Sequence, residues 1–125
     1  MRALLVMVHG SPHESANADM HRVVKVVRAR GRFDRVEVGF MECNHPSIPD
    51  AAKMCVDAGA TEIVAVPYFL HSGVHVADDL PTLMEQCERD YPNVSFALGR
   101  YIGTSEVIPK ILQARATVAV SRPTV

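Results

Sequence analysis

Residues 2–8 form a near-continuous apolar run that ends at His9 and Gly10. A strand that is apolar on both sides is typical of a parallel sheet covered by helices, whereas a half-exposed antiparallel strand alternates apolar and polar residues. The run is too short for the apolar region of a secretory signal, and no small-residue cleavage site follows it. We therefore expect a buried strand of a parallel sheet, which requires crossover helices later in the chain.

The first half of the chain supplies the next three elements. Apolar residues recur at helical spacing over positions 20–27, between a cap at Ser15 and a stop at Gly31. Positions 36, 38 and 40 are apolar and alternate with other residues, as in a second strand. Ser47 and Asp50 then form the start signal of a second helix, which closes near Gly59.

The second half repeats the pattern. Residues 63–66 are a third apolar strand, followed by a third helix that we expect to be capped near Asp78. Residues 94–98 make a fourth strand. Thr104 or Ser105 opens a last helix, which carries apolar residues at positions 107, 108, 111 and 112.

Alternating strands and helices with right-handed crossovers predict an α/β fold: a doubly wound, four-stranded parallel sheet in the order 2-1-3-4, with helices on both faces. We expect residues 1–125 to be a single domain, with a frayed tail from about Ala116. The strand order reverses between strands one and three, so a ligand is expected above their carboxyl ends. The segments 9–17 and 67–78 should line that crevice.

Composition excludes several functional classes. The chain has 13 basic and 14 acidic residues and no polybasic stretch, which argues against a nucleic-acid partner. Its apolar runs stop well before the ~18 residues of a membrane span. Cys43, Cys55 and Cys87 are odd in number and lack C-x-x-C spacing, which argues against a disulfide framework or a zinc knuckle and favours a reducing cytoplasm. Cys55 and Cys87 fall on apolar helix faces and are explained by packing.

The histidines carry the main functional signal. All six lie in the first 75 residues, and four lie in the two segments expected to line the crevice: His9, His13, His71 and His75. Imidazole binds borderline divalent metals and accepts a proton near neutral pH, so this clustering suggests a metal or general-base site. The alternative is that they are polar loop residues. The pair His71 and His75 does not form a zinc-protease motif, because Ser72 stands where that motif has glutamate and Gly73 indicates a loop.

The chain also resembles a known family through five segments in order. It is similar to the CbiX-type sirohydrochlorin chelatases, and the likeness runs from Met1 to about Leu112. The chain's length matches the short form of the family, in which one domain corresponds to half of the longer relatives. The segments that carry the resemblance are Val8–Ser11, Phe40–Glu42, Pro46–Ile48, Pro67–His75 and Asp79–Pro81.

The resemblance implies roles for the matching positions. His9 matches the family histidine that binds the incoming metal and accepts a proton, and His75 matches the second metal ligand. His45 matches a position that contacts substrate in relatives. Glu42 matches a family acid that acts as a proton acceptor or outer metal contact; the alternative is a charge that stabilises the N-terminus of the next helix. The remaining implied substrate contacts are Gly10, Ser11, Leu70, His71, Ser72, Gly73 and Val74.

The implied activity is insertion of a divalent metal into sirohydrochlorin, in cobalamin or sirohaem biosynthesis. Co²⁺ is the expected metal, with Ni²⁺ or Fe²⁺ as alternatives; it is a co-substrate, and no tightly bound cofactor is expected. Metallation requires a weak base for two pyrrole protons and few protein ligands, so that the metal can leave. A non-catalytic metal or tetrapyrrole carrier would use the same histidines and stays open. An esterase is excluded because the chain has no G-x-S-x-G elbow.

The size of a tetrapyrrole predicts a homodimer. One small domain offers a shallow crevice, whereas the substrate is a broad disc that needs a second wall, supplied here by two-fold symmetry. Leu70 and Val74 are candidates for the cavity lining or the subunit contact. The crevice segments contain no Lys or Arg, so the substrate's carboxylates must be bound by backbone N–H groups, helix ends or basic residues such as Arg100.

Overall fold

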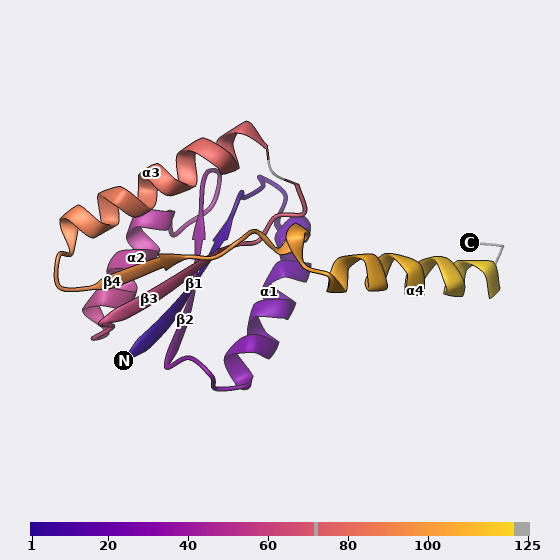
Figure 1. Cartoon of the computed structure of the whole chain (residues 1–125), viewed down its shortest axis with the longest axis horizontal. Helices are drawn as coiled ribbons and strands as arrows, with labels where there is room; N and C mark the ends of the chain where they lie inside the picture. The colour runs from indigo at the N-terminus through magenta and orange to yellow at the C-terminus, as the bar shows by residue number, and fades with distance from the viewer. Residues whose placement is uncertain (72, 122–125) are drawn as a thin grey trace.

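The computed structural model describes residues 1–71 and 73–121, with residues 74–76 described by their backbone alone. Its strands form a parallel sheet in the order β2-β1-β3-β4 (Figure 1). The expected fold class and strand order are confirmed. The strands are β1 (Arg2–Val8), β2 (Arg35–Phe40), β3 (Glu62–Pro67) and β4 (Ser95–Leu98).

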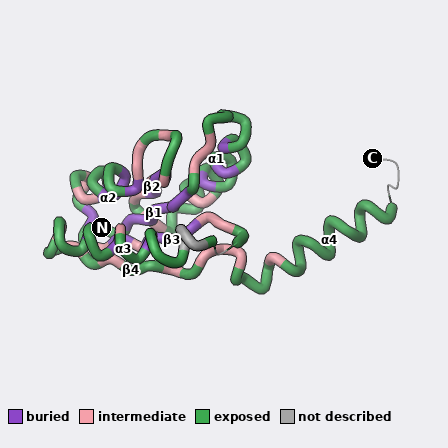
Figure 2. Tube along the Cα trace, turned by 90° about the horizontal axis from the view of Figure 1, so that it is seen from above, coloured by how far each residue is buried: buried purple, intermediate pink, exposed green. Residues whose placement is uncertain are grey.

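One face of the sheet, which we call the closed face, lies beneath α2 (Ile48–Asp57) and α3 (Val74–Asp90) (Figure 1). The side chains that alternate onto this face from β1 and β3 are 0% exposed: Ala3, Leu5, Met7, Ile63 and Ala65. Gly39 of β2 permits the close approach of α2, because a Cβ there would lie 2.7 Å from the Ile48 Cα atom. Figure 2 shows this buried layer as the purple strands between the helices.

The opposite face is covered only in part, and we call it the half-open face. The helix α1 (Glu14–Ala29) packs over β1 and β2 through Met20 and Val24. Among the described residues, no second helix packs beside α1 over β3. Val66 and Tyr68, which belong to this side, are therefore only partly buried.

The helix starts confirm one sequence prediction and correct two. The hydroxyl of Ser47 caps α2 by accepting from the Asp50 N–H at 3.2 Å, as predicted. The prediction of Ser15 as the cap of α1 is wrong, because Ser15 lies inside the first turn and His13 is the N-cap. The prediction that α3 begins near Asp78 is also wrong. The helix begins at Val74 behind Gly73, because an extended glycine suffices as an N-cap and needs no capping side chain.

The start of α3 was misplaced because Asp78 offers a capping side chain and Gly73 offers none. Pro81 lies in the interior of the helix, where it lacks the N–H that would bond to the carbonyl four residues earlier. The turn that precedes it is nevertheless helical, since the Ala77 N–H donates to the Gly73 carbonyl at 3.2 Å.

The C-terminal segment leaves the sheet entirely. A short 3-10 helix, η1 (Ile102–Thr104), is followed by α4 (Val107–Ser121), which projects away from the body of the domain (Figure 1). Ser105 opens α4 by accepting from the Val107 N–H at 3.2 Å, which matches one of the two predicted starts. The predicted fraying from Ala116 is wrong as far as Ser121, because the helix continues to that residue. In the described part of the chain, no helix is long and apolar enough to cross a membrane.

Two of the three cysteines lie in the closed face. Cys55 and Cys87 are buried as predicted, and all three cysteines are free thiols. Burial, followed by the negative charge of Glu37, raises the pKa of the Cys55 thiol from 9.0 to about 11. Burial also raises the pKa of Cys87. Both residues therefore act as small neutral core residues at neutral pH.

Candidate functional site

The carboxyl ends of β1 and β2 bring a histidine and a glutamate together. The Nε2 atom of His9 lies 3.1 Å from the Oε1 atom of Glu42, and the Nδ1 atom of His9 lies 3.1 Å from the carbonyl oxygen of Gly10. The two side chains are 53% and 59% exposed, so a ligand can reach them from solvent. The structure thus joins two residues that the sequence places 33 positions apart.

Backbone hydrogen bonds fix the two segments that carry this pair. Beyond the ends of the strands, the Met41 N–H donates to the Val8 carbonyl at 2.8 Å and the Glu42 N–H donates to the His9 carbonyl at 3.0 Å. Gly10 makes this approach sterically feasible. Its φ of 97° lies in the region that favours glycine, and a Cβ there would lie 2.0 Å from the Glu42 carbonyl oxygen.

Asn44 is a positioning residue that sequence reasoning missed. Its Oδ1 atom accepts from the Ser11 N–H at 2.7 Å and from the Asn17 amide at 3.2 Å. Asn17 is the buried polar residue of α1, so Asn44 ties the start of α1 and the segment after His9 to the β2–α2 loop. No spacing pattern links these positions, because the contacts are 33 and 27 residues apart in sequence.

The β3–α3 segment lies beside β1 at the same edge of the sheet, since the Tyr68 N–H donates to the Met7 carbonyl at 2.8 Å. Leu70 is 58% exposed and His71 is exposed. Ser72 lies outside the described residues. The prediction of a loop from Leu70 to His75 holds only as far as Gly73, because Val74 and His75 belong to the first turn of α3. The side chains of Val74 and His75 lie outside the described part of the structure, so their predicted contacts stay predictions.

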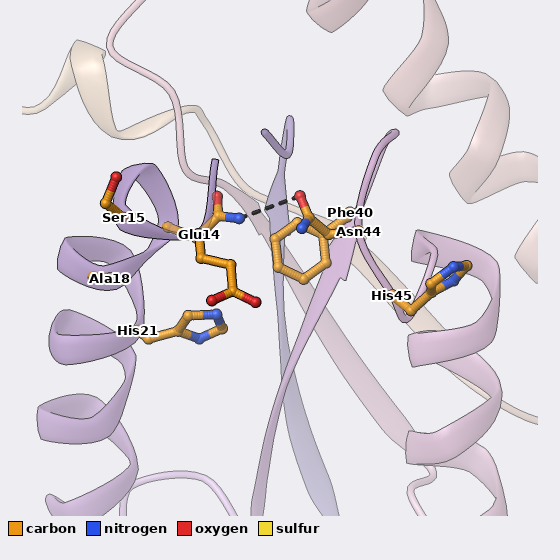
Figure 3. Close-up of a pocket in the computed structure, with 8 residues that line it drawn as sticks. Glu14, Ser15, Ala18, His21, Phe40, Asn44 and His45 are labelled. Atoms are coloured by element: carbon orange, nitrogen blue, oxygen red, sulfur yellow. Dashed lines mark hydrogen bonds between the residues drawn. The ribbon is translucent and has the colours of Figure 1, made fainter. Parts of the chain in front are cut away.

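A hollow of about 590 Å³ lies beside β2 and not above β1 and β3, where the strand order predicts the ligand. Asn17 and Asn44 both line it, and the Asn17 amide donates to the Asn44 Oδ1 atom. The carboxylate of Glu14 and the ring of His21 lie on α1 below Asn44 (Figure 3). His45 lines the hollow, but its imidazole points away from Glu14 and His21 (Figure 3). His45 therefore does not converge with these two side chains.

Within the described residues, no three His, Cys, Asp or Glu side chains form a group that could hold a metal ion. The pair His9 and Glu42 is thus an open, two-donor arrangement. Arg100, the predicted anion-binding candidate, is exposed just after β4.

Comparison with known proteins identifies the family. The CbiX family model matches residues 3–119. The chain belongs to the CbiX family. A sirohydrochlorin cobaltochelatase of Methanococcus maripaludis is 42% identical over 92 residues, covering 72% of this chain and 62% of the relative. A sirohydrochlorin cobaltochelatase of Sulfurisphaera tokodaii is 32% identical over 115 residues, covering 92% of this chain and 91% of the relative.

Solved structures of the family share the fold. The sirohydrochlorin chelatase SirB from Bacillus subtilis subspecies spizizenii, in complex with cobalt, superposes with a TM-score of 0.85 at 28% identity. The match covers 93% of this chain and 50% of SirB. Several curated relatives are also longer, and the chain spans 62% and 50% of the lengths of the cobaltochelatase of Methanococcus maripaludis and a chloroplastic sirohydrochlorin ferrochelatase of Arabidopsis thaliana.

Proposed function

We propose that this CbiX-family chain catalyses insertion of a divalent metal into sirohydrochlorin. The observation that carries the proposal is the 3.1 Å contact between His9 Nε2 and Glu42 Oε1 at the open carboxyl edge of the sheet. The names of the relatives support the substrate: cobaltochelatases of Methanococcus maripaludis and Sulfurisphaera tokodaii, and a ferrochelatase of Bacillus subtilis. They favour Co²⁺ as the metal, with Fe²⁺ as the alternative that relatives also support, and Ni²⁺ as a third.

The distance of 3.1 Å between His9 Nε2 and Glu42 Oε1 fits either a hydrogen bond or a metal ion bound by both atoms. With Nδ1–H donating to the Gly10 carbonyl, the Nε2 atom of His9 presents a lone pair. At this separation Nε2 can either carry a hydrogen that it donates to the carboxylate of Glu42 or share a metal ion with that carboxylate. Two donors at right angles on a metal with bonds of ~2.1 Å are ~3.0 Å apart. The pair can therefore exchange a proton for a metal ion with little movement.

This exchange supplies the chemistry that metallation needs. Two pyrrole N–H protons must leave the macrocycle as the metal enters it, and His9 and Glu42 are the acceptors at the site. Because the metal is a substrate, it must bind weakly enough to be released into the ring, and a pair of side-chain donors meets that requirement. We assign Glu42 to this role in preference to helix stabilisation, because its carboxylate contacts His9.

The remaining parts of the proposal concern residues and partners beyond this pair. We propose His75 as the second histidine ligand and the segment 70–75 as the holder of the tetrapyrrole, supported by the match to the family's motif. A homodimer would enclose the broad face of the substrate, since the described site is open to solvent. The three free thiols support a reducing, cytoplasmic setting.

Absorbance spectroscopy under anaerobic conditions tests the function. Protein is mixed with excess sirohydrochlorin and Co²⁺, Ni²⁺ or Fe²⁺, and the spectral shift on metallation is followed over time. We expect His9→Ala to lower the rate by about 10²-fold or more, because general acid–base groups contribute that much. The control His13→Ala removes an exposed histidine four positions later in the chain and should stay within about twofold of the unmodified protein. Equal rates for the two variants would refute the assignment of His9.

The same assay separates an enzyme from a carrier. An enzyme converts many equivalents of sirohydrochlorin for each chain, whereas a carrier stops at one bound equivalent. Product that never exceeds the concentration of protein would support the carrier and contradict catalysis.

A further inference from the structure

The half-open face carries a groove of about 300 Å³ that nothing in the described chain fills. It lies between α1 and β3, and apart from the tyrosine hydroxyl its lining side chains are hydrocarbon. Val23 of α1 is 37% exposed and lines the groove, although a valine on a helix that faces a sheet is ordinarily buried. The lining residues are Leu4, Val6, Val23, Val24, Val27, Val66, Tyr68 and Ile102.

The helix α4 is rich in apolar residues that the rest of the described chain does not cover. None of its residues is buried, and apolar residues occupy positions 107, 111, 114 and 118, which the spacing of four, three and four places on one side of a helix. Lys110, Gln113 and Thr117 flank this side along one edge, and the opposite side is also apolar, with Leu112 and Val120. Ile111 and Leu112 are 49% and 71% exposed. A helix that is apolar over most of its surface and uncovered requires a partner surface.

The junction before α4 directs the helix away from its own groove. The Gly103 N–H donates to the Phe69 carbonyl at 2.9 Å, and a Cβ on Gly103 would lie 2.0 Å from the Leu70 carbonyl oxygen, so η1 is held against the end of β3. The Ser105 N–H donates to the Ile102 carbonyl at 3.0 Å, and Ser105 then caps α4. With this junction, α4 leaves the domain and does not pack on its own groove (Figure 1).

We propose that α4 docks in the groove of a second copy of this chain, whose own α4 docks in return, so that two chains exchange their C-terminal helices. The arrangement is isologous, because one helix and one groove on each chain are used twice. This arrangement covers the half-open face of each sheet and, on each copy of α4, the side that carries positions 107, 111, 114 and 118. The inference rests on the proposed homodimer and is independent of the metal chemistry of His9 and Glu42.

Matched charge insertions test the contact by analytical ultracentrifugation. We expect the unmodified protein to be a dimer at micromolar concentration. Ile111→Glu on the apolar side of α4 and Val23→Glu in the groove should each weaken dimerisation about tenfold or more, because each buries a carboxylate among hydrocarbon. Gln113→Glu and Val26→Glu are the controls: each adds the same charge to the same helix outside the proposed contact, and both should leave the dimer unchanged. Val26 is 49% exposed and does not line the groove.

Mixing the two disrupted variants tests the exchange itself. A Val23→Glu chain keeps an intact α4, and an Ile111→Glu chain keeps an intact groove, so the mixture can form a dimer with one undamaged contact. Affinity-tagged Val23→Glu protein should therefore retain untagged Ile111→Glu protein and should not retain untagged Val23→Glu protein. Circular dichroism verifies folding, and Val23→Lys replaces Val23→Glu if the latter fails to fold.

Three results would overturn the proposal. A monomeric unmodified protein would indicate that α4 is not exchanged. Loss of the dimer in Ile111→Glu but not in Val23→Glu would indicate that α4 pairs with α4. Absence of rescue on mixing would indicate a contact within one chain. Metallation by a monomer would leave the proposed function standing while the exchange fails, so the two failures are distinguishable.

Discussion

The closed face of the sheet and the carboxyl edge of the same strands are built from opposite kinds of residue. On the closed face, side chains of β1 and β3 are fully buried hydrocarbon beneath α2 and α3. At the edge, His9 and Glu42 are more than half exposed and interact through a single polar contact. Burial of apolar area supplies stability, whereas an exposed ion pair contributes little. The comparison indicates that stability and chemistry can be altered separately in this chain.

The largest expected effect comes from the closed face. Ile63→Ala removes a fully buried side chain from the centre of the core and should lower the free energy of unfolding by about 2–5 kcal/mol. His9→Ala at the edge should change it by less than about 0.5 kcal/mol, because the removed side chain is mostly solvated. Urea unfolding of both variants measures the difference. Similar losses in the two variants would contradict the separation of stability from chemistry.

Asn44 is the residue where the two regions meet, and its removal should affect both. Asn44→Ala leaves the buried Asn17 amide and the Ser11 N–H without their acceptor, which should lower the free energy of unfolding by about 1–3 kcal/mol. The metallation rate should also fall, because Ser11 follows His9 closely in the chain. Asn44→Asp keeps an acceptor oxygen and should restore most of both quantities. A stable but inactive Asn44→Ala protein would show that the residue serves the edge alone.

A smaller effect, on the affinity for Co²⁺, is expected to distinguish His75 from His71. His75→Ala should lower the affinity for Co²⁺ about tenfold, equivalent to about 1.4 kcal/mol, whereas His71→Ala should be milder. The reason is that only His75 matches the family's metal-binding position. Calorimetric titration of each variant with Co²⁺ measures both affinities. Equal losses would instead indicate a site with three histidines.

The sequence predicted the closed face better than the edge. Apolar periodicity depends on neighbours a few positions apart, so it located all four strands and the cap of α2 at Ser47. The family resemblance indicated both His9 and Glu42 as site residues, but neither their pairing nor the bridge through Asn44 was predicted. Both depend on backbone contacts between residues about 30 positions apart, which no local pattern encodes.

The position of the C-terminal helix relative to the sheet was also not predicted from the sequence. The helical spacing of α4 was predicted, but its separation from the sheet was not. The apolar residues of α4 indicate that the helix is covered, and they do not indicate by which surface. The start of α3 was misplaced for a local reason, because Asp78 has a capping side chain whereas the helix begins behind Gly73.

The smallest expected effect is a pH dependence that originates in the closed face. The pKa of the buried Cys55 thiol is raised from 9.0 to about 11 by desolvation, followed by the charge of Glu37. Between these two values the unfolded chain releases the proton while the folded chain keeps it, so ionisation favours unfolding. The contribution is fully present below about pH 9 and is lost as the pH rises toward 11.

Cys55→Ala isolates this contribution, because the variant has no thiol to ionise at that position. At neutral pH the variant should be less stable than the unmodified protein by a constant amount, owing to the cavity left in the core. As the pH rises through the window, the unmodified protein should lose stability faster, and the difference between the two proteins should narrow. Urea unfolding at intervals from pH 8 to 11 measures this difference. If it stayed constant across that range, ionisation of the buried thiol would not be coupled to unfolding, and Cys55 would act in the closed face through packing alone.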